Sequence, residues 1–133
     1  MTQVADIMKQ EVVTVEKGAN VMDAIRKLVK YNFTGLPVVD DKDRVIGIVS
    51  EKDVLALAIR VNEKKYVSDE THLRVEDFMT KEVVTVEATE SLTALCSCLM
   101  KNEFRRVPVV LKNKLVGIVS RKDVISYILK IQN

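Results

Sequence analysis

The sequence predicts a mixed α/β (α+β) protein in which one β-α-β-β-α unit occurs twice. The octapeptide GIVSEKDV at 47–54 returns as GIVSRKDV at 117–124, with a single residue changed. The hexapeptide EVVTVE at 11–16 returns unchanged at 82–87. Motifs that return in the same order at nearly the same spacing indicate an internal duplication.

Each copy starts with an extended segment and continues into a helix. Apolar residues recur with i, i+3, i+4 spacing over 21–29 in the first copy and over 92–100 in the second. This spacing predicts an amphipathic helix with one face on a core. Asn20 and Ser91 come directly before the two stripes and are the expected N-caps.

A pair of short strands follows each helix. LPVVD and VIGIVS flank the turn DKDR at 41–44 in the first copy, and VPVVL and LVGIVS flank KNK at 112–114 in the second. Runs of β-branched residues separated by a few turn residues predict β-hairpins. The second turn is one residue shorter than the first.

A closing helix is expected to begin at Ser50 in the first copy and at Ser120 in the second. The stretches VLALAIRV (54–61) and VISYILKI (124–131) are apolar on nearly every side. A helix of this kind needs partners on several sides, so we expect a homodimer that packs through the closing helices. The alternative is that each is a fully buried core helix.

The composition is that of an ordinary globular domain. Of 133 residues, 47% are hydrophobic and 30% are charged, and the net charge is +2 with both signs mixed along the chain. This balance, with only three tyrosines and three phenylalanines, argues against nucleic-acid binding. The N-terminus has no signal-peptide pattern and no apolar run approaches 18 residues, so we expect a cytoplasmic protein without a membrane partner.

The residues form no pattern typical of catalysis or of metal binding. No nucleophile–base pair and no phosphate-binding glycine-rich loop is found. Cys96 and Cys98 are two residues apart in a predicted helix, so their side chains point in different directions, and we expect a structural role. His72 lies in the polar stretch 61–74, which we expect to be a linker. We therefore expect no enzyme, no metal and no required cofactor.

The Ser-x-x-Asp sequence at the start of each closing helix has two interpretations. Ser50 and Asp53 can bond each other's backbone N–H groups as a capping box, and Ser120 with Asp123 repeats the pattern. The same group could hold a ligand, because a strand glycine three residues before the serine permits close approach. Helix N-termini also attract anions, and acidic side chains bind ribose hydroxyls. The residues alone leave both interpretations open.

The order of these motifs, present twice, resembles the cystathionine β-synthase (CBS) domain family. The resemblance covers a first repeat at 4–60, a linker at 61–74 and a second repeat at 75–130. It implies that the repeats pair by pseudo-two-fold packing of their sheets into one module. It also implies that AMP, ADP, ATP or S-adenosylmethionine binds in the clefts between repeats, and that two modules stack into a dimer through their helices.

The resemblance also assigns binding residues to this chain. The positions that match ribose contacts are Ser50, Asp53, Ser120 and Asp123. The positions that match phosphate contacts are Arg105, Arg106, Lys122 and Lys52. The positions expected to line the adenine cleft are Ala19, Thr34, Gly35 and Thr89, although Thr89 could instead be a helix-start residue.

In the family each site takes its aspartate from one repeat and its phosphate contacts from the other. The Asp53 site would then gain two arginines and a lysine from the second repeat, whereas Lys52 would be the cation of the Asp123 site. Arginines suit phosphate because the planar guanidinium donates two bonds at once. We therefore expect a phosphorylated adenosine at the Asp53 site. The Asp123 site would be weaker, empty or suited to a less anionic ligand.

The expected function is regulation without turnover. A bound adenosine ligand would tie the repeats together and alter the contacts of the dimer or of a regulated protein. The rival is a structural or protein-interaction module that binds no ligand and acts through its apolar helices. The capping interpretation, and Thr34 and Gly35 where the second repeat has arginines, favour this rival.

Overall fold

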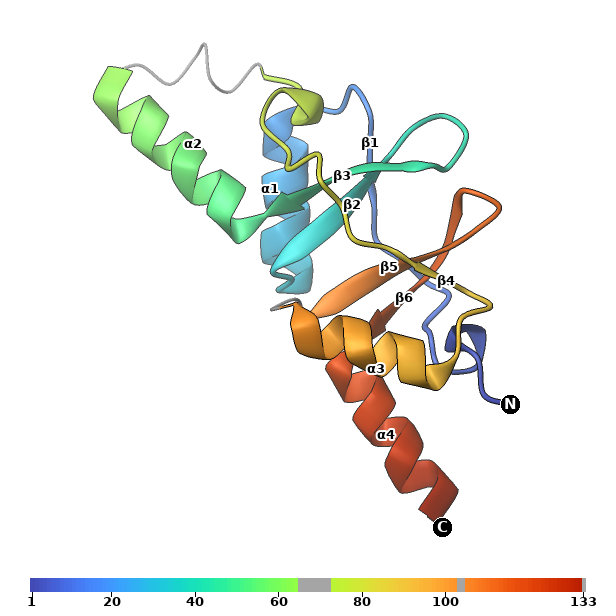
Figure 1. Ribbon diagram of the computed structural model, residues 1–133. Coiled ribbons are helices and arrows are strands. Elements are labelled where there is room, and N and C mark those ends of the chain that lie inside the picture. The colour runs from blue at the N-terminus through green and yellow to red at the C-terminus, as the bar shows by residue number, and fades with distance from the viewer. Residues whose placement is uncertain (65–72, 103–104, 133) are drawn as a thin grey trace. The chain divides into compact units, whose positions relative to one another are not determined.

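A computed structural model describes residues 1–64, 73–102 and 105–132 of the chain (Figure 1). The chain divides into two compact units. The first-repeat unit is Val13–Val83, and the second-repeat unit is Met1–Val12 together with Val84–Asn133. Both contain the β-α-β-β-α order that the sequence predicts.

The first-repeat unit is a three-stranded sheet with two helices. Its elements are β1 (Val15–Glu16), α1 (Val21–Tyr31), β2 (Gly35–Val39), β3 (Val45–Ser50), α2 (Glu51–Lys64) and the short 3-10 helix η3 (Val75–Asp77). β1 is parallel to β2, and β2 is antiparallel to β3. α2 continues four residues into the expected linker, whereas His72 lies outside the described residues.

The second-repeat unit has the same topology. Its elements are η1 (Val4–Asp6), β4 (Val86–Glu87), α3 (Leu92–Lys101), β5 (Arg106–Leu111), β6 (Lys114–Ser120) and α4 (Arg121–Gln132). The strand order is β4-β5-β6, with β4 parallel to β5 and β5 antiparallel to β6. No described helix is long and apolar enough to cross a membrane.

The first twelve residues belong to the unit of the second repeat. The N–H of Val4 donates to the carbonyl of Glu90 at 2.9 Å. Lys9 and Ile118 exchange two backbone hydrogen bonds of 2.8 and 2.9 Å, which attach this segment to β6. Val4 is fully buried. We call residues 1–12 the N-terminal opening segment.

Residues 73–83 have the equivalent place in the first-repeat unit, and we call them the middle opening segment. The N–H of Val75 donates to the carbonyl of Ala19 at 2.9 Å, and Ile48 and Thr80 exchange two bonds of 2.9 Å. Each opening segment therefore lies on the strand before the closing helix of the other sequence repeat.

Each unit has its own hydrophobic core. In the first-repeat unit the core includes Val15, Ala24, Leu28, Leu36, Val38, Val49 and Val75. In the second-repeat unit it includes Val4, Val86, Leu95, Leu99, Val107, Val109 and Val119. The buried residues of α1 and α3 lie on the predicted stripes, which confirms that both helices are amphipathic. The last residue of each stripe is the exception, since Val29 is 76% and Met100 is 83% exposed.

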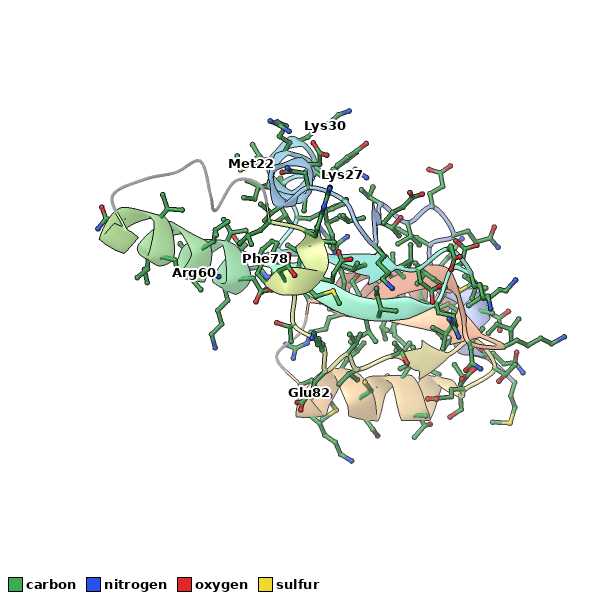
Figure 2. The ribbon with its side chains drawn as sticks, turned by 90° about the horizontal axis from the view of Figure 1, so that it is seen from above. Met22, Lys27, Lys30, Arg60, Phe78 and Glu82 are labelled. Atoms are coloured by element: carbon green, nitrogen blue, oxygen red, sulfur yellow. The ribbon has the colours of Figure 1, made fainter. Side chains whose placement is uncertain are left out.

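The predicted N-caps are confirmed. The Asn20 side chain accepts from the N–H of Met22 at 2.8 Å, and the Ser91 hydroxyl accepts from the N–H of Ala94 at 3.1 Å. On the same first helix, the ammonium group of Lys27 (labelled in Figure 2) donates to the carbonyl of Thr14 at 2.7 Å. This bond fastens α1 to the chain just before β1.

The two hairpins turn differently, which accounts for the length difference between the copies. In the first, the Asp40 carboxylate accepts the N–H groups of Lys42 and Arg44, each at 2.9 Å. The bond from the Arg44 backbone contributes most to lowering the pKa of Asp40. In the second, Lys112 and Asn113 have φ values of 52° and 65°. Two consecutive left-handed residues make a tight two-residue turn, so one residue fewer is needed.

Two strand glycines permit the opening segments to lie against their strands. A Cβ atom on Gly117 would lie 2.5 Å from the Met8 sulfur and 2.9 Å from the Lys9 carbonyl oxygen. A Cβ atom on Gly47 would collide with the Met79 thioether. The sequence predicts a close approach at these glycines, and the approaching group is a methionine of the chain itself.

We expect Gly117→Ala to lower the free energy of unfolding by about 1–3 kcal/mol, because the opening segment must shift to admit the methyl group. Gly47→Ala should cost less, since the obstructing atoms belong to a flexible methionine side chain and not to backbone. Urea unfolding measures both. Gly35→Ala is the control, because its Cβ would meet neighbours only at 3.4 Å and beyond. Equal losses at all three positions would contradict this explanation.

The single difference between the octapeptides has a structural reason. α1 ends at Asn32 in the left-handed conformation, and the Asn32 N–H bonds carbonyls of the last turn. α3 ends at Asn102 in an extended conformation. There the Arg121 guanidinium donates to the carbonyls of Leu99 and Asn102 at 2.8 and 2.7 Å. Arg121 thus supplies the C-terminal bonds of α3 that the chain itself supplies in α1.

Arg121→Glu, which makes the second octapeptide identical to the first, should lower the free energy of unfolding by about 1–3 kcal/mol. It removes two charge-assisted hydrogen bonds and places an anion beside helix carbonyls. The reciprocal change Glu51→Arg should cost under about 1 kcal/mol, the loss of a favourable charge at the α2 N-terminus. Thermal unfolding of the two variants provides the comparison. A larger loss for Glu51→Arg would refute the role given to Arg121.

Candidate ligand-binding site

The capping interpretation of Ser-x-x-Asp is confirmed in both units. The Asp53 carboxylate accepts the N–H of Ser50 at 2.8 Å, and the Ser50 hydroxyl accepts the N–H of Asp53 at 3.3 Å. In the second-repeat unit the equivalent bonds between Ser120 and Asp123 measure 2.9 and 3.1 Å. Both aspartates are thereby held in one orientation at a helix start.

The surroundings of Asp53 are neutral hydrogen-bond donors. The Ser50 hydroxyl donates to its Oδ2 at 2.9 Å, and the Thr80 hydroxyl lies 3.1 Å from Oδ1 and 3.4 Å from Oδ2. Gly35 faces Ser50 across β2 and β3, so the adjacent strand contributes no side chain. We call Ser50, Asp53, Thr80 and Gly35 the Asp53 half-site.

The surroundings of Asp123 are cationic. The Lys9 ammonium lies 3.6 Å from its Oδ1, and the side chains are 73% and 14% exposed, respectively. Arg106 faces Ser120 across β5 and β6. Burial lowers the pKa of the Arg106 guanidinium, while the negative charge of Asp123 raises it. We call Ser120, Asp123, Lys9 and Arg106 the Asp123 half-site.

A small cavity opens beside Asp123. Its volume is about 190 Å³, and it is lined by Asp6, Ile7, Lys9, Asp123, Ser126, Tyr127 and Lys130. The Tyr127 hydroxyl bonds the Thr2 hydroxyl at 2.6 Å, which ties the opening segment to α4. Ligand pockets usually measure about 300–1,000 Å³, so this cavity suits part of a ligand, such as a sugar.

The remaining predicted site residues lie at the surface or in backbone contacts. The exposed ones are Arg105, Lys52, Lys122 and Thr89. The carbonyl of Ala19 accepts from Val75, and that of Thr34 accepts from Glu51 at 3.0 Å. Within each unit the structure brings the serine and aspartate together. The assignment of phosphate contacts across the repeats stays a prediction.

The sequence interpretation did not include Lys9 and Thr80. Both lie in opening segments, and Thr80 is 27 residues from the aspartate that it contacts. The signal that could have found them is the repeat itself. Lys9 and Thr80 each follow the methionine of their opening segment, so they align. At this one position the two copies differ by one positive charge.

Each unit also has an apolar groove between its two helices. In the first-repeat unit it measures about 370 Å³ and is lined by residues including Ile25, Val29, Phe33 and Leu55. In the second-repeat unit it measures about 450 Å³ and is lined by Cys96, Leu99, Met100, Arg121, Val124 and Ile125.

The closing helices leave large apolar side chains exposed. They are Leu55 and Ile59 on α2, and Ile125, Ile128, Leu129 and Ile131 on α4, with exposed fractions between 43% and 65%. The alternative that these are fully buried core helices is therefore wrong.

Comparison with known proteins identifies both repeats. The CBS domain matches residues 4–60 and 75–130. The uncharacterized protein MJ1225 of Methanocaldococcus jannaschii is 31% identical over 123 residues, which cover 92% of this chain and 41% of that protein. The chain spans less than half the length of the first curated relatives that it matches.

Solved structures with the same fold contain adenosine compounds. CBSX2 of Arabidopsis thaliana in complex with AMP is 33% identical, has a TM-score of 0.84, and is covered completely, as is this chain. The CBS domain pair of MJ0100, in complex with 5′-methylthioadenosine and S-adenosyl-L-methionine, is 26% identical with a TM-score of 0.74. That likeness covers 100% of this chain and 99% of the other. With both of its repeats matched, the chain belongs to the CBS-domain family.

Proposed function

We propose that this chain is a regulatory module that binds an adenosine-containing ligand and performs no catalysis. The candidate ligands are AMP, ADP, ATP and S-adenosylmethionine. The observation that carries the proposal is the pair of oriented carboxylates, Asp53 and Asp123, each held by a serine at a helix start. The AMP and S-adenosylmethionine bound by related CBS pairs support this ligand class.

An oriented carboxylate is well suited to a ribose. The 2′- and 3′-hydroxyls donate two hydrogen bonds, and a carboxylate accepts both with its two oxygens. Because the capping box holds the side chain before any ligand arrives, binding does not have to restrict its rotamers. Ser50 and Ser120 would share the ribose contacts with the two aspartates.

The basic residues supply the phosphate contacts in this proposal. They are Arg105, Arg106, Lys122 and Lys52. Arg106 is half-buried, so its guanidinium is partly desolvated and would gain from a phosphate oxygen. Lys52 and Lys122 lie in the first turn of a helix, where a cation opposes the helix dipole unless an anion binds nearby. Ala19, Thr34, Gly35 and Thr89 would contribute to the adenine cleft.

The exposed faces of α2 and α4 would transmit ligand occupancy. The isoleucines and leucines on these helices form apolar surfaces of the kind that marks a protein interface. We propose a homodimer that packs through these helices, and a regulated protein that responds to its geometry. A ligand shifts such an equilibrium only to the extent that it binds one conformation better than another.

A second candidate is an interaction module that binds no ligand. It is favoured by the capping boxes, which give both Ser-x-x-Asp sequences a purely structural role, and by the same exposed helix faces.

We expect the double variant Arg105→Ala/Arg106→Ala to bind AMP about 10- to 100-fold more weakly, since charge-assisted hydrogen bonds contribute about 1.5–3 kcal/mol each. Its affinity for adenosine should stay within about twofold of wild type, because adenosine has no phosphate. Isothermal titration with both ligands measures this. Arg26→Ala is the control, because Arg26 is an exposed arginine that pairs with Asp23 of its own helix α1. Equal loss of both ligands would argue against the phosphate role. If the wild-type protein binds none of the four ligands or adenosine, the ligand proposal is contradicted and the interaction module is favoured.

The dimer has its own test. The wild-type protein should sediment as a dimer, and the double variant Leu55→Glu/Leu129→Glu should sediment as a monomer, because two buried carboxylates would face the partner. The control is Leu111→Glu, which changes an exposed leucine on β5. A monomeric wild-type protein, or a dimer that survives the double change, would exclude this interface.

A further inference from the structure

The two candidate carboxylates contact different groups at one aligned position. Thr80 donates a neutral hydroxyl to Asp53, whereas Lys9 places an ammonium beside Asp123. Lys9 and Thr80 each follow the methionine of an opening segment, and each segment is attached by backbone bonds to the strand before the closing helix. The difference therefore comes from the side chain and not from a different course of the backbone.

The other charged residues that line the cavity beside Asp123 align with residues of the same charge, although the next position of the opening segments pairs Gln10 with Lys81. The cavity beside Asp123 also contains Asp6 and Lys130. The aligned residues of the first-repeat unit are Asp77 and Arg60, and Arg60 lies on α2 (Figure 2). Ser126 and Tyr127 align with uncharged residues. Among the positions that line the cavity, only residue 9 and its counterpart differ in charge.

The strand beside each half-site, β5 or β2, adds a second difference in charge, again positive on the side of Asp123. Arg106 stands where the first repeat has Gly35, and it interacts electrostatically with Asp123. The carboxylate, the opening-segment residue and the strand residue together carry one net positive charge in the Asp123 half-site. The same three positions carry one net negative charge in the Asp53 half-site.

This charge difference has a consequence for the kind of ligand. A neutral diol that binds Asp123 must compete with the Lys9 ammonium for a carboxylate oxygen. The competition is mild, because the Lys9 side chain is 73% exposed and its ammonium lies 3.6 Å from the carboxylate, so water screens the attraction. A ligand with a phosphate offers the displaced ammonium a new anion, so the lost interaction is replaced. At Asp53 the contacts that the described residues make are a backbone N–H and two hydroxyls, so a neutral diol there displaces neutral donors.

We propose that Lys9 is a specificity-determining residue that makes the Asp123 half-site prefer anionic adenosine ligands to neutral ones. Thr80 leaves the Asp53 half-site without this preference. The inference rests on the proposed function, because it concerns the same carboxylates. It is opposite to the expectation from the sequence, which assigns the less anionic ligand to the Asp123 site and does not include Lys9.

The test compares the dissociation constants of adenosine and AMP by isothermal titration. An Asp53→Asn background removes the charged diol acceptor of the Asp53 half-site, so that binding reports on the Asp123 half-site. The asparagine amide oxygen can still cap α2. Adding Lys9→Thr should lower the ratio of the adenosine constant to the AMP constant about fivefold, the upper value for an exposed ion pair. Lys114→Thr is the matched control, since this exposed lysine lies at the opposite end of β6 from Ser120. It should leave the ratio unchanged.

The reciprocal change gives an independent readout. In an Asp123→Asn background, Thr80→Lys should raise the same ratio about fivefold, and 0.5 M salt should reduce that rise by screening. If both ligands bind and Lys9→Thr leaves the ratio unchanged, the inference is overturned while the proposed function stands. An Asp53→Asn protein that binds neither ligand would also overturn it, since its Asp123 half-site would then select nothing. If the wild-type protein binds neither adenosine nor AMP, both this inference and the proposed function are overturned.

Discussion

The contact between an opening segment and a strand glycine determines how each unit is built. At Gly117 and at Gly47 a methionine lies where any side chain would be. Backbone hydrogen bonds then attach the next residue to the strand. That residue, Lys9 in one unit and Thr80 in the other, thereby lies within reach of the aspartate at the following helix start. The packing of the methionine and the composition of the half-site are thus consequences of one contact.

The ligand contact proposed for each aspartate is compatible with its structural role as part of a helix cap. Capping engages one carboxylate oxygen of Asp53 with the N–H of Ser50 and leaves the other to Thr80. A helix cap contributes about 1 kcal/mol, so the aspartate stabilises the helix start whether or not a ligand binds. The cap interpretation and the ligand interpretation describe one arrangement. The capping hydrogen bonds also fix the orientation of the carboxylate. A diol could therefore bind it without any rearrangement of the helix start.

Duplication preserved the backbone and allowed the charges to diverge. Arg121 replaces a glutamate because α3 ends without the left-handed residue that closes α1. Lys9 and Arg106 of the second-repeat unit stand where the first-repeat unit has Thr80 and Gly35, and both differences add positive charge near Asp123. Each unit folds around its own core, so one half-site can change its charge without repacking the other.

The sequence by itself determined the duplication, the β-α-β-β-α order, both helix N-caps and the two capping boxes. These depend on local patterns, namely apolar spacing, turn residues and a polar residue directly before a helix. Only the tertiary structure decided that the opening segments cross to the other repeat, that methionines cover the strand glycines, and that Lys9 and Thr80 meet the aspartates. These contacts join residues far apart in the chain. The spacing of residues in the sequence does not predict these contacts. Backbone pairing between distant segments depends on which strand edge is unpaired and on where a small residue such as glycine permits close approach.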